Sequence, residues 1–519
     1  MVVGASADRT VLAILPGFGE NFSMADGAVE TEQAEVDDRL FAVAMGPPQK
    51  SATPSSVTPK TFRHYDQSQS FLIPPSLDDW LPANHEARFI SDAVEDLLDL
   101  SPIYAAYTTA DGAPPYAPQM MLKLLLYGYS TGVTSSREIE RRCVVDVAFR
   151  WLAANATPDY RSIARFRRRH LGVLDELFTQ VLRLCAGAGL VSLGRVALDG
   201  TKLRASASRH KAMSYDHLVK KTEQLKAEVA AILAEAEAID QAEDEAFGAD
   251  RRGDEIDPEL SRRETRLAKM RVAMDAIETE AREKAAAKAA EQVEAKGGSR
   301  DEIAEATKRA VEAATPSPKA QRNFTDPDAR IMKTADGSFH YTFNGQAVVD
   351  EAHQVVLSGA LTQEATDVKQ LIPMIEATDT DLTAAGIDGS PRVLLADAGY
   401  CSADNLEALV ATGLDALVAT GRLSHDEQVP PRPRGRIPKN ATAKQRMARR
   451  LRTKSGKADY ARRKVIVEPA FGQMKTRQHA GQLRLRGLAG AQGEWTLHLV
   501  CHNLRKLANA AGSAAITPA

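Results

Sequence analysis

This chain has few cysteines, no long apolar run and a net charge close to zero. Its four cysteines, spread over 519 residues without a Cys-x-x-Cys pair, argue against a zinc knuckle or a disulfide framework and favour buried free thiols. No stretch of about 18 apolar residues occurs, and the first residues lack a charged start followed by an apolar segment. We therefore expect a soluble, cytoplasmic protein without a membrane span or a secretory signal.

The near-zero charge hides a separation of acidic and basic segments. The chain has 66 Lys and Arg against 69 Asp and Glu, which gives a formal net charge of -3 at pH 7. This balance excludes no nucleic-acid partner when the two signs lie in different segments. With 44% apolar residues, the chain is long enough for about two to four domains with a sizeable hydrophobic core.

Three short motifs each place one carboxylate at the end of an apolar run or at the start of a helix. They are Val196-Ala-Leu-Asp199-Gly-Thr, Val393-Leu-Leu-Ala-Asp397-Ala-Gly-Tyr and Val465-Ile-Val-Glu468-Pro-Ala-Phe-Gly-Gln-Met-Lys475. Converging carboxylates repel one another unless cations neutralise them, and such hard oxygen ligands suit Mg²⁺ or Mn²⁺. A pair of these ions can clamp the attacking and leaving oxygens of a phosphoryl transfer. The motifs therefore predict an enzyme that cleaves or rejoins nucleic acid.

Each acid also has a structural interpretation that involves no catalysis. Asp199 before Gly-Thr fits a turn, and Asp397 before Ala-Gly-Tyr fits a helix cap. Glu468 before Pro469 fits the first turn of a helix, where an acid interacts well with the helix dipole. The combined order of strand, strand and helix, with a basic tract attached, favours catalysis.

Changes in composition divide the chain into segments. Residues 1–60 mix small, acidic and Pro residues without periodicity, so we expect a disordered leader there and assign it no function. The other expected segments are a helical DNA-binding domain at 61–190, a helical insertion at 211–324, a basic insertion at 422–464, and a catalytic core formed by 191–210 and 325–510.

Two short arginine-bearing helices predict a DNA-reading unit of the helix-turn-helix type. They begin with capping residues near Thr134 and Thr157. Arg165, Arg168 and Arg169 share one face of the second helix, which favours contact with phosphates. The alternative is a solvated basic face on an ordinary helical bundle.

The insertion is rich in Ala, Glu, Lys and Leu. Its apolar residues recur every seven positions at Leu218, Leu225, Ile232 and Ile239, and after a break at Leu260, Leu267 and Met274. Two helices that fold back as a coiled-coil-like hairpin would bury both seams, either within one chain or between two subunits. A further helix is expected after Ile277, and the spacing of Ser299 and Glu302 predicts a capping box for one more.

The region after the insertion alternates strands and helices. We expect strands at 339–343, 346–349, 354–357, 392–397 and 416–420, turns at 344–345 and 350–353, and helices at 367–375 and from Ser402 onward. A helix that carries Glu468 follows. This order predicts an α/β fold with an RNase H-like mixed sheet.

A basic tract precedes Glu468. Between Arg432 and Lys464 there are fourteen Lys or Arg residues and a single acid, Asp459. This density favours binding of the DNA backbone over a solvated surface. The candidate contacts are Arg446, Arg449, Arg450, Arg452, Arg462, Arg463 and Lys464. Lys475, seven residues after Glu468, projects from the same helix face and can reach a phosphate beside the metals.

Three further residues are expected to serve the structure alone. His479 and His502 are single histidines of the kind that usually pack or lie at the surface. Trp495 lies in an amphipathic C-terminal helix, where core packing is favoured over base stacking.

The acidic motifs and the Glu-x6-Lys spacing resemble the DDE transposases of bacterial insertion sequences, most closely the IS1182 group of the wider IS4/IS5-like set. The resemblance extends over about residues 62–508 and includes Phe62-Arg-His-Tyr-Asp-Gln and Ser135-Ser-Arg-Glu-Ile-Glu-Arg. It implies that Asp199, Asp397 and Glu468 hold two Mg²⁺ ions, for which Mn²⁺ can substitute. It further implies nicking of the element ends and their joining to target DNA, by a homodimer associated with the nucleoid.

The chain departs from the family at one place. The family's Tyr-x2-Arg-x3-Glu-x6-Lys pattern would place Tyr at 461 and Arg at 464, whereas Tyr460 and Arg463 stand one residue earlier. One residue turns a side chain by about 100° around a helix, so the pattern supports Lys464 and Lys475 as DNA contacts more strongly than Tyr460 and Arg463.

Two rival functions are weighed against this resemblance. A haloacid-dehalogenase-type phosphatase would need an Asp two residues before Asp199, where the chain has Ala197. A domesticated, inactive DNA-binding protein should have lost one of the three acids, and all three are present.

Overall fold

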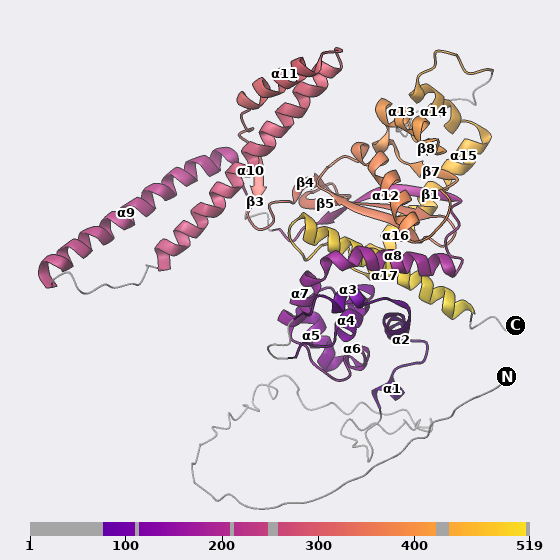
Figure 1. Ribbon diagram of the computed structural model, residues 1–519, viewed down its shortest axis with the longest axis horizontal. Coiled ribbons are helices and arrows are strands. Elements are labelled where there is room, and N and C mark those ends of the chain that lie inside the picture. Colours follow the sequence, from indigo (N-terminus) through magenta and orange to yellow (C-terminus); the bar gives the residue numbers. More distant parts are fainter. Residues whose placement is uncertain (1–75, 109–113, 208–211, 248–257, 422–434, 515–519) are drawn as a thin grey trace, which may run out of the picture. The chain divides into compact units, whose positions relative to one another are not determined.

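The computed structural model describes residues 76–108, 114–207, 212–247, 258–421 and 435–514 (Figure 1). The expected leader at 1–60 lies outside these residues, as do Arg432 and Arg434 of the basic tract. Within the described part of the chain, no helix is both long enough and apolar enough to cross a membrane. All four cysteines are free and three of them are buried, which confirms the expectation of free thiols.

Short helices make up the described residues from 77 to 187. They are α1 (Leu77–Trp80), α2 (Glu86–Asp92), the π-helix η2 (Ala93–Leu97), α3 (Ser101–Tyr104), α4 (Pro118–Ser130), α5 (Ser136–Val145), α6 (Val147–Leu152), α7 (Tyr160–Arg169), the 3₁₀ helix η3 (Leu171–Val173) and α8 (Leu174–Gly187). The mostly apolar α4 is buried along nearly its whole length, so it forms the centre of this group.

The two expected arginine-bearing helices are α5 and α7. The structure adds the short α6 between them, so they are not joined by a simple turn. The Asp146 side chain caps α6 by accepting from the N–H groups of Ala148 and Phe149. Asp159 caps α7 in the same way through Arg161 and Ser162.

A mixed sheet forms the centre of the region that carries the acidic motifs. Its strands are β1 (Arg195–Arg204), β4 (Arg330–Lys333), β5 (Phe339–Asp350), β6 (Val356–Thr362), β7 (Val393–Ala396) and β8 (Ala416–Val418). The order is β4-β5-β1-β7-β8, and β6 also pairs with β5. β5 is antiparallel to β1, β4 and β6, whereas β7 is parallel to β1 and β8 is parallel to β7. The expected mixed α/β sheet is therefore confirmed.

The turn expected at Asn344-Gly345 is wrong, because β5 runs without interruption from Phe339 to Asp350. Gly345 pairs with Thr201 of β1. A Cβ on Gly345 would lie 3.0 Å from Leu203 Cδ1 and 3.3 Å from Trp495 Cε2. This glycine therefore serves close packing against a tryptophan instead of bending the chain.

Helices alternate with the later strands. They are the 3₁₀ helix η5 (Val368–Gln370), α12 (Leu371–Ala384), the 3₁₀ helix η6 (Ala398–Tyr400), α13 (Ala403–Thr412), α14 (Ala443–Leu451), α15 (Lys454–Ala461), α16 (Arg463–Arg477) and α17 (Leu488–Ala514). α16 packs against β1 and β5, while α17 packs against β6 and also against α4 and α8. Trp495 of α17 is fully buried, as expected for a core residue.

The insertion consists of α9 (Tyr215–Phe247), α10 (Pro258–Glu294) and α11 (Arg300–Glu312). These helices lie in the chain between β2 (Ala212–Ser214) and β3 (Gln321–Asn323), which pair as a two-stranded sheet. Leu218 and Leu225 of α9 share a buried cluster with Leu267 and Met270 of α10. The separate helix expected after Ile277 is wrong, because α10 continues to Glu294 through a run of good helix formers. The predicted capping box of Ser299 and Glu302 is confirmed.

Candidate active site

Asp199 and Asp397 lie at corresponding positions of two adjacent parallel strands. Leu198 of β1 pairs with Ala396 of β7, and each aspartate is the next residue of its chain. Adjacent strands are about 4.8 Å apart, so the two carboxylates reach the same region at one end of the sheet. Asp199 pairs with Ala347 of β5 and lies inside β1, so its interpretation as a turn residue is wrong.

The Asp199 carboxylate is bound on both oxygens. Its Oδ1 accepts from the Gly200 N–H at 2.8 Å, and its Oδ2 accepts from Arg463 Nη1 at 2.8 Å. Burial raises the pKa of Asp199, the Arg463 charge lowers it, and the nearby Asp397 charge raises it again. The Arg463 guanidinium thus already places a positive charge against this carboxylate.

Asp397 directly follows β7 and caps the 3₁₀ turn η6. Its Oδ1 accepts from the Gly399 N–H at 2.7 Å, so the helix-cap interpretation is confirmed. A carboxylate has two oxygens and several lone pairs. Capping therefore does not exclude a role for Asp397 as a metal ligand.

Glu468 lies in the second turn of α16, which begins at Arg463, so its interpretation as a first-turn acid is wrong. The next residue, Pro469, has no N–H for the carbonyl of Val465. Gln354 Nε2 donates to that carbonyl instead, at 3.2 Å. The proline is thus accommodated inside the helix, and Glu468 remains exposed.

The structure brings the three acids only partly together. Asp199 and Asp397 are neighbours, and Glu468 lies on a helix that packs against β1. Within the part of the chain that is described, no three His, Cys, Asp or Glu side chains form a metal-binding group. The two aspartates nevertheless fit a divalent cation, because both are hard oxygen donors and the Arg463 guanidinium already places positive charge against Asp199.

Tyr460, Arg463 and Lys475 lie close to the same carboxylates. The Arg463 side chain is 11% exposed, and the Tyr460 hydroxyl, whose pKa is raised by burial, interacts with it. Burial lowers the pKa of Lys475, and the charge of Asp199 raises it. The chain changes from α15 to α16 at Arg462, so one continuous helical register does not relate Tyr460 to Glu468. Lys464 is exposed.

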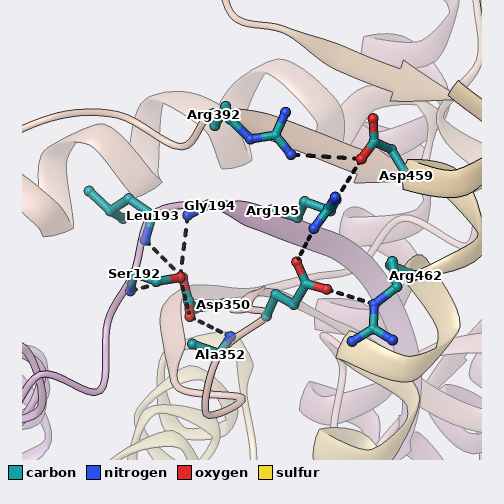
Figure 2. Close-up of polar contacts among 10 residues, drawn as sticks. Ser192, Leu193, Gly194, Arg195, Asp350, Ala352, Arg392, Asp459 and Arg462 are labelled. Carbon is teal, nitrogen blue, oxygen red and sulfur yellow. Dashed lines mark hydrogen bonds and ion pairs between the residues drawn. The ribbon is translucent and has the colours of Figure 1, made fainter. Parts of the chain in front are cut away.

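Arg462 is bound within the protein. Its Nε donates to Glu351 at 2.6 Å, and Glu351 also binds Arg195 at 2.8 Å (Figure 2). Arg195 in turn donates to Asp459 at 2.6 Å, and Arg392 lies 3.7 Å from the same carboxylate. We call these five residues the ion-pair chain. The ion-pair chain connects the junction of α15 and α16 to the start of β1 and to the turn between β5 and β6.

The other candidate DNA contacts differ in how strongly they are engaged. Arg165 and Arg168 are exposed on α7, as is Arg446 on α14. Several others make contacts within the protein: Arg169 stacks on Tyr107 at 4.5 Å, Arg450 pairs with Asp415, Arg449 donates to the Gly435 carbonyl, and Arg452 donates to the Ala448 carbonyl.

The two histidines have structural contacts. Nδ1 of the exposed His479 lies 3.0 Å from the Gly132 carbonyl. His502 is buried, and its Nε2 lies 2.8 Å from the Gln354 carbonyl.

A group of polar residues near the aspartates was not anticipated. Asp367 accepts hydrogen bonds from Asn344 and Gln346, and the buried Tyr400 hydroxyl donates to Gln346. Their signal in the sequence was the run of polar residues at alternate positions of the strand, which ends with Asn344 and Gln346. This signal was missed because a turn was expected at residues 344–345, in the middle of β5.

Two families match parts of the chain. Residues 75–169 match the family described as Transposase domain (DUF772), and residues 312–504 match the Transposase DDE domain. Together the matches cover somewhat more than half of the chain. The second includes Asp397 and Glu468, and it implies an RNase H-like core, with which the mixed sheet agrees. No curated protein and no solved structure matches the chain.

Proposed function

Because the chain belongs to the DDE transposases, we propose that it nicks the ends of an insertion sequence and joins them to target DNA by phosphoryl transfer, with Asp199, Asp397 and Glu468 as its catalytic acids. The observation that carries this proposal is the placement of Asp199 and Asp397 at corresponding positions of adjacent parallel strands. Arg463 adds to it, because its bond to Asp199 joins that strand to the helix of Glu468.

Two Mg²⁺ or Mn²⁺ ions held by these carboxylates would activate the attacking water or 3′-hydroxyl and stabilise the departing 3′-oxygen. The strands fix the backbone of Asp199 and the end of β7 before Asp397, so these two side chains need little reorganisation. Glu468 approaches from α16, whose start is held by Arg463 and by the ion-pair chain.

Basic side chains near the acids are suited to hold the DNA backbone. Arg463 has further guanidinium donors besides the one bound to Asp199, and a guanidinium can bind a phosphate through two of them. Lys475 lies seven residues after Glu468 on α16 and provides a compact charge for the neighbouring phosphate. The exposed Arg165, Arg168, Arg446 and Lys464 would position the flanking duplex without reading its sequence.

Both ends of a mobile element must be cut in one complex, so the proposed active form is a homodimer on paired terminal inverted repeats. The described seam between α9 and α10 is filled from within the chain, so this dimer is not assigned to it. Sedimentation of the full chain with end DNA should give two protomers per two DNA ends. A single protomer on one end under cleavage conditions would contradict the dimer.

Strand cleavage of the DNA that flanks the chain's own gene tests the activity. Asp199→Ala, Asp397→Ala and Glu468→Ala should each lower the Mg²⁺-dependent rate by about a thousandfold, because several kcal/mol of transition-state stabilisation is lost. Asp404→Ala is the matched control, since Asp404 is an exposed acid close to Asp397 in the sequence. An acid whose removal leaves cleavage at the Asp404→Ala rate is not catalytic.

A further inference from the structure

Asp367 lies against the two glycines that follow the catalytic aspartates. A Cβ on Gly200 would lie 2.6 Å from Asp367 Oδ1, and a Cβ on Gly399 would lie 3.4 Å from Asp367 Oδ2. The first distance is too short for a Cβ, so a larger residue at position 200 would displace the carboxylate, whereas the second is an ordinary van der Waals contact. Gly200 of the Asp199-Gly motif therefore makes room for a fourth carboxylate, which also contacts the Asp397-Ala-Gly turn.

This carboxylate approaches β1 from the side opposite Asp199. Gly200 and Lys202 pair with Gln346 and Asn344 of β5, so these four residues share one face of the sheet. Asp199 precedes Gly200 and points to the other face. Asp367 thus contacts β1 at Gly200, next to Asp199, on the face of the sheet opposite the Asp199 side chain.

Asp367 is held in place by three polar side chains. Its Oδ1 accepts from Asn344 Nδ2 at 2.7 Å and from Gln346 Nε2 at 2.8 Å, and Lys202 Nζ lies 3.8 Å away. Asn344 and Gln346 are fully buried. The position of the carboxylate is therefore fixed relative to both β1 and β5.

The same network reaches the turn of Asp397. The Tyr400 hydroxyl, at the end of η6, donates to Gln346 Oε1. Asn405 Nδ2 donates to the Tyr400 carbonyl at 2.7 Å and to the Val368 carbonyl, next to Asp367, at 2.6 Å. Two independent bridges therefore connect the Asp397 turn to the Asp367 segment.

This arrangement is costly for a purely structural role. Among the described atoms, the buried Lys202 Nζ and Asn344 Oδ1 have no hydrogen-bond partner, although Lys202 forms the ion pair with Asp367. Unsatisfied buried polar groups lower stability, and apolar residues of similar volume would pack this face at lower cost. Their presence beneath the active site therefore calls for a functional explanation.

We propose that Asp367 is a positioning residue that holds Asp199 and Asp397 at the separation needed to share divalent cations. It acts through the backbone of Gly200 and through the Gly399-Tyr400 turn, and Tyr400 and Gln346 transmit its position to Asp397. The inference rests on the proposed function, because it assumes that the two aspartates bind metal. Substitution of a residue that positions a metal ligand typically lowers metal affinity by about 10- to 100-fold.

Binding of Mn²⁺ alone to the full chain, followed by electron paramagnetic resonance of the free ion, tests the proposal without any cleavage reaction. Asp367→Ala should raise the Kd for Mn²⁺ by about tenfold or more, and Tyr400→Phe, which removes only the hydroxyl, should raise it by about threefold. Asp367→Asn keeps the size of the side chain but removes its charge, and it should fall between these two variants.

Asp350 provides the matched control. It is fully buried at the other end of β5 and accepts from the N–H groups of Leu193 and Ala352 at 3.0 and 2.9 Å (Figure 2). Asp350→Ala should lower stability but leave the Kd for Mn²⁺ within about twofold of the wild type, because it does not support the metal ligands. An equal rise of the Kd in Asp350→Ala and Asp367→Ala would reduce Asp367 to a general stability residue and overturn the proposal.

A wild-type Kd in folded Asp367→Ala also overturns it, as does a wild-type Kd in both Asp367→Asn and Tyr400→Phe if Asp367→Ala does not fold. Asp199→Ala and Asp397→Ala separate this failure from that of the proposed function. If they lose Mn²⁺ while Asp367→Ala retains it, only the positioning role is wrong. If they too retain Mn²⁺, the metal site itself is wrong.

Discussion

Arg463 and Asp199 form an ion pair of 2.8 Å that joins the first residue of α16 to the middle of β1. The side chains are 11% and 21% exposed, so the pair is largely shielded from water. Since Glu468 lies on the same helix, the orientation of the third acid depends on a contact made by the first.

Loss of this ion pair should destabilise the protein. Arg463→Ala leaves Asp199 without its cation, and we expect the free energy of unfolding to fall by about 1.5–3 kcal/mol, as for hydrogen bonds to charged groups. Urea unfolding measures it, with Arg446→Ala as the control because Arg446 is exposed in the same basic tract. Equal stability of the two variants would show that the Arg463 bond contributes nothing.

Stability should decrease as the pH falls from 6.5 to 5. Burial lowers the pKa of His498 to about 3 and that of His502 to about 4, below the value of 6.5 in the unfolded chain. The unfolded state therefore binds more protons in this window, and each histidine should cost roughly 2 kcal/mol over these 1.5 pH units. Above pH 6.5 the contribution is fully present.

Urea unfolding at several pH values measures this slope. His502→Gln should remove about half of it, because Gln retains a donor for the Gln354 carbonyl but does not titrate in this range. An unchanged slope in His502→Gln would mean that His502 is already protonated in the folded protein.

Arg446 and Arg462 should affect DNA binding differently. Arg446 is exposed, so Arg446→Ala should reduce the slope of log K against log salt by about 1. Arg462→Ala should leave the slope nearly unchanged, because its guanidinium is bound to Glu351. Fluorescence anisotropy with one duplex at several salt concentrations measures both, and equal losses would mean that DNA draws Arg462 away from Glu351.

The ion-pair chain should contribute modestly and lose strength in salt. A double-mutant cycle of Glu351→Gln and Arg462→Gln should give a coupling of about 0.5–1 kcal/mol, reduced in 1 M NaCl. Arg462 is 48% exposed, which is why a larger coupling is not expected. A coupling that persists in 1 M salt would indicate that the pair is more shielded than its exposure implies.

Two glycine substitutions should have opposite effects on thermal stability. Gly345→Ala places a methyl group 3.0 Å from Leu203 Cδ1 and should cost about 1–3 kcal/mol through overpacking. Gly472→Ala meets nothing within 4 Å and lies inside α16, so it should gain about 0.5–1 kcal/mol. A destabilised Gly472→Ala would indicate a neighbour that the described residues do not include.

The mixed sheet followed from local patterns in the sequence. The short apolar runs that precede Asp199 and Asp397 favoured buried strands, and the helix cap at Ser402 was a local signal for α13. Asn344-Gly345 misled the prediction because the same dipeptide favours a hairpin turn and also permits close packing. Only the tertiary contact with Trp495 distinguishes the two cases.

The candidate site was less accessible from the sequence. Motif spacing picked out Asp199 and Asp397, but it could not reveal that Arg463 binds Asp199, because the helix break at Arg462 changes the register. Asp367 belongs to no motif of its own. It becomes visible only when two glycines and a pair of buried amides are brought together from separate segments.

The place of α17 has a consequence for the time at which activity can arise during translation. This last described helix packs against β6, α4 and α8, and its Trp495 fills the space left by Gly345. β1, which carries Asp199, can pair only when β5 and β7 are present, and both are synthesised after the long insertion. A ribosome must therefore synthesise the chain as far as α17 before the acids can assemble, so a product terminated before α17 should have no capacity to cut DNA.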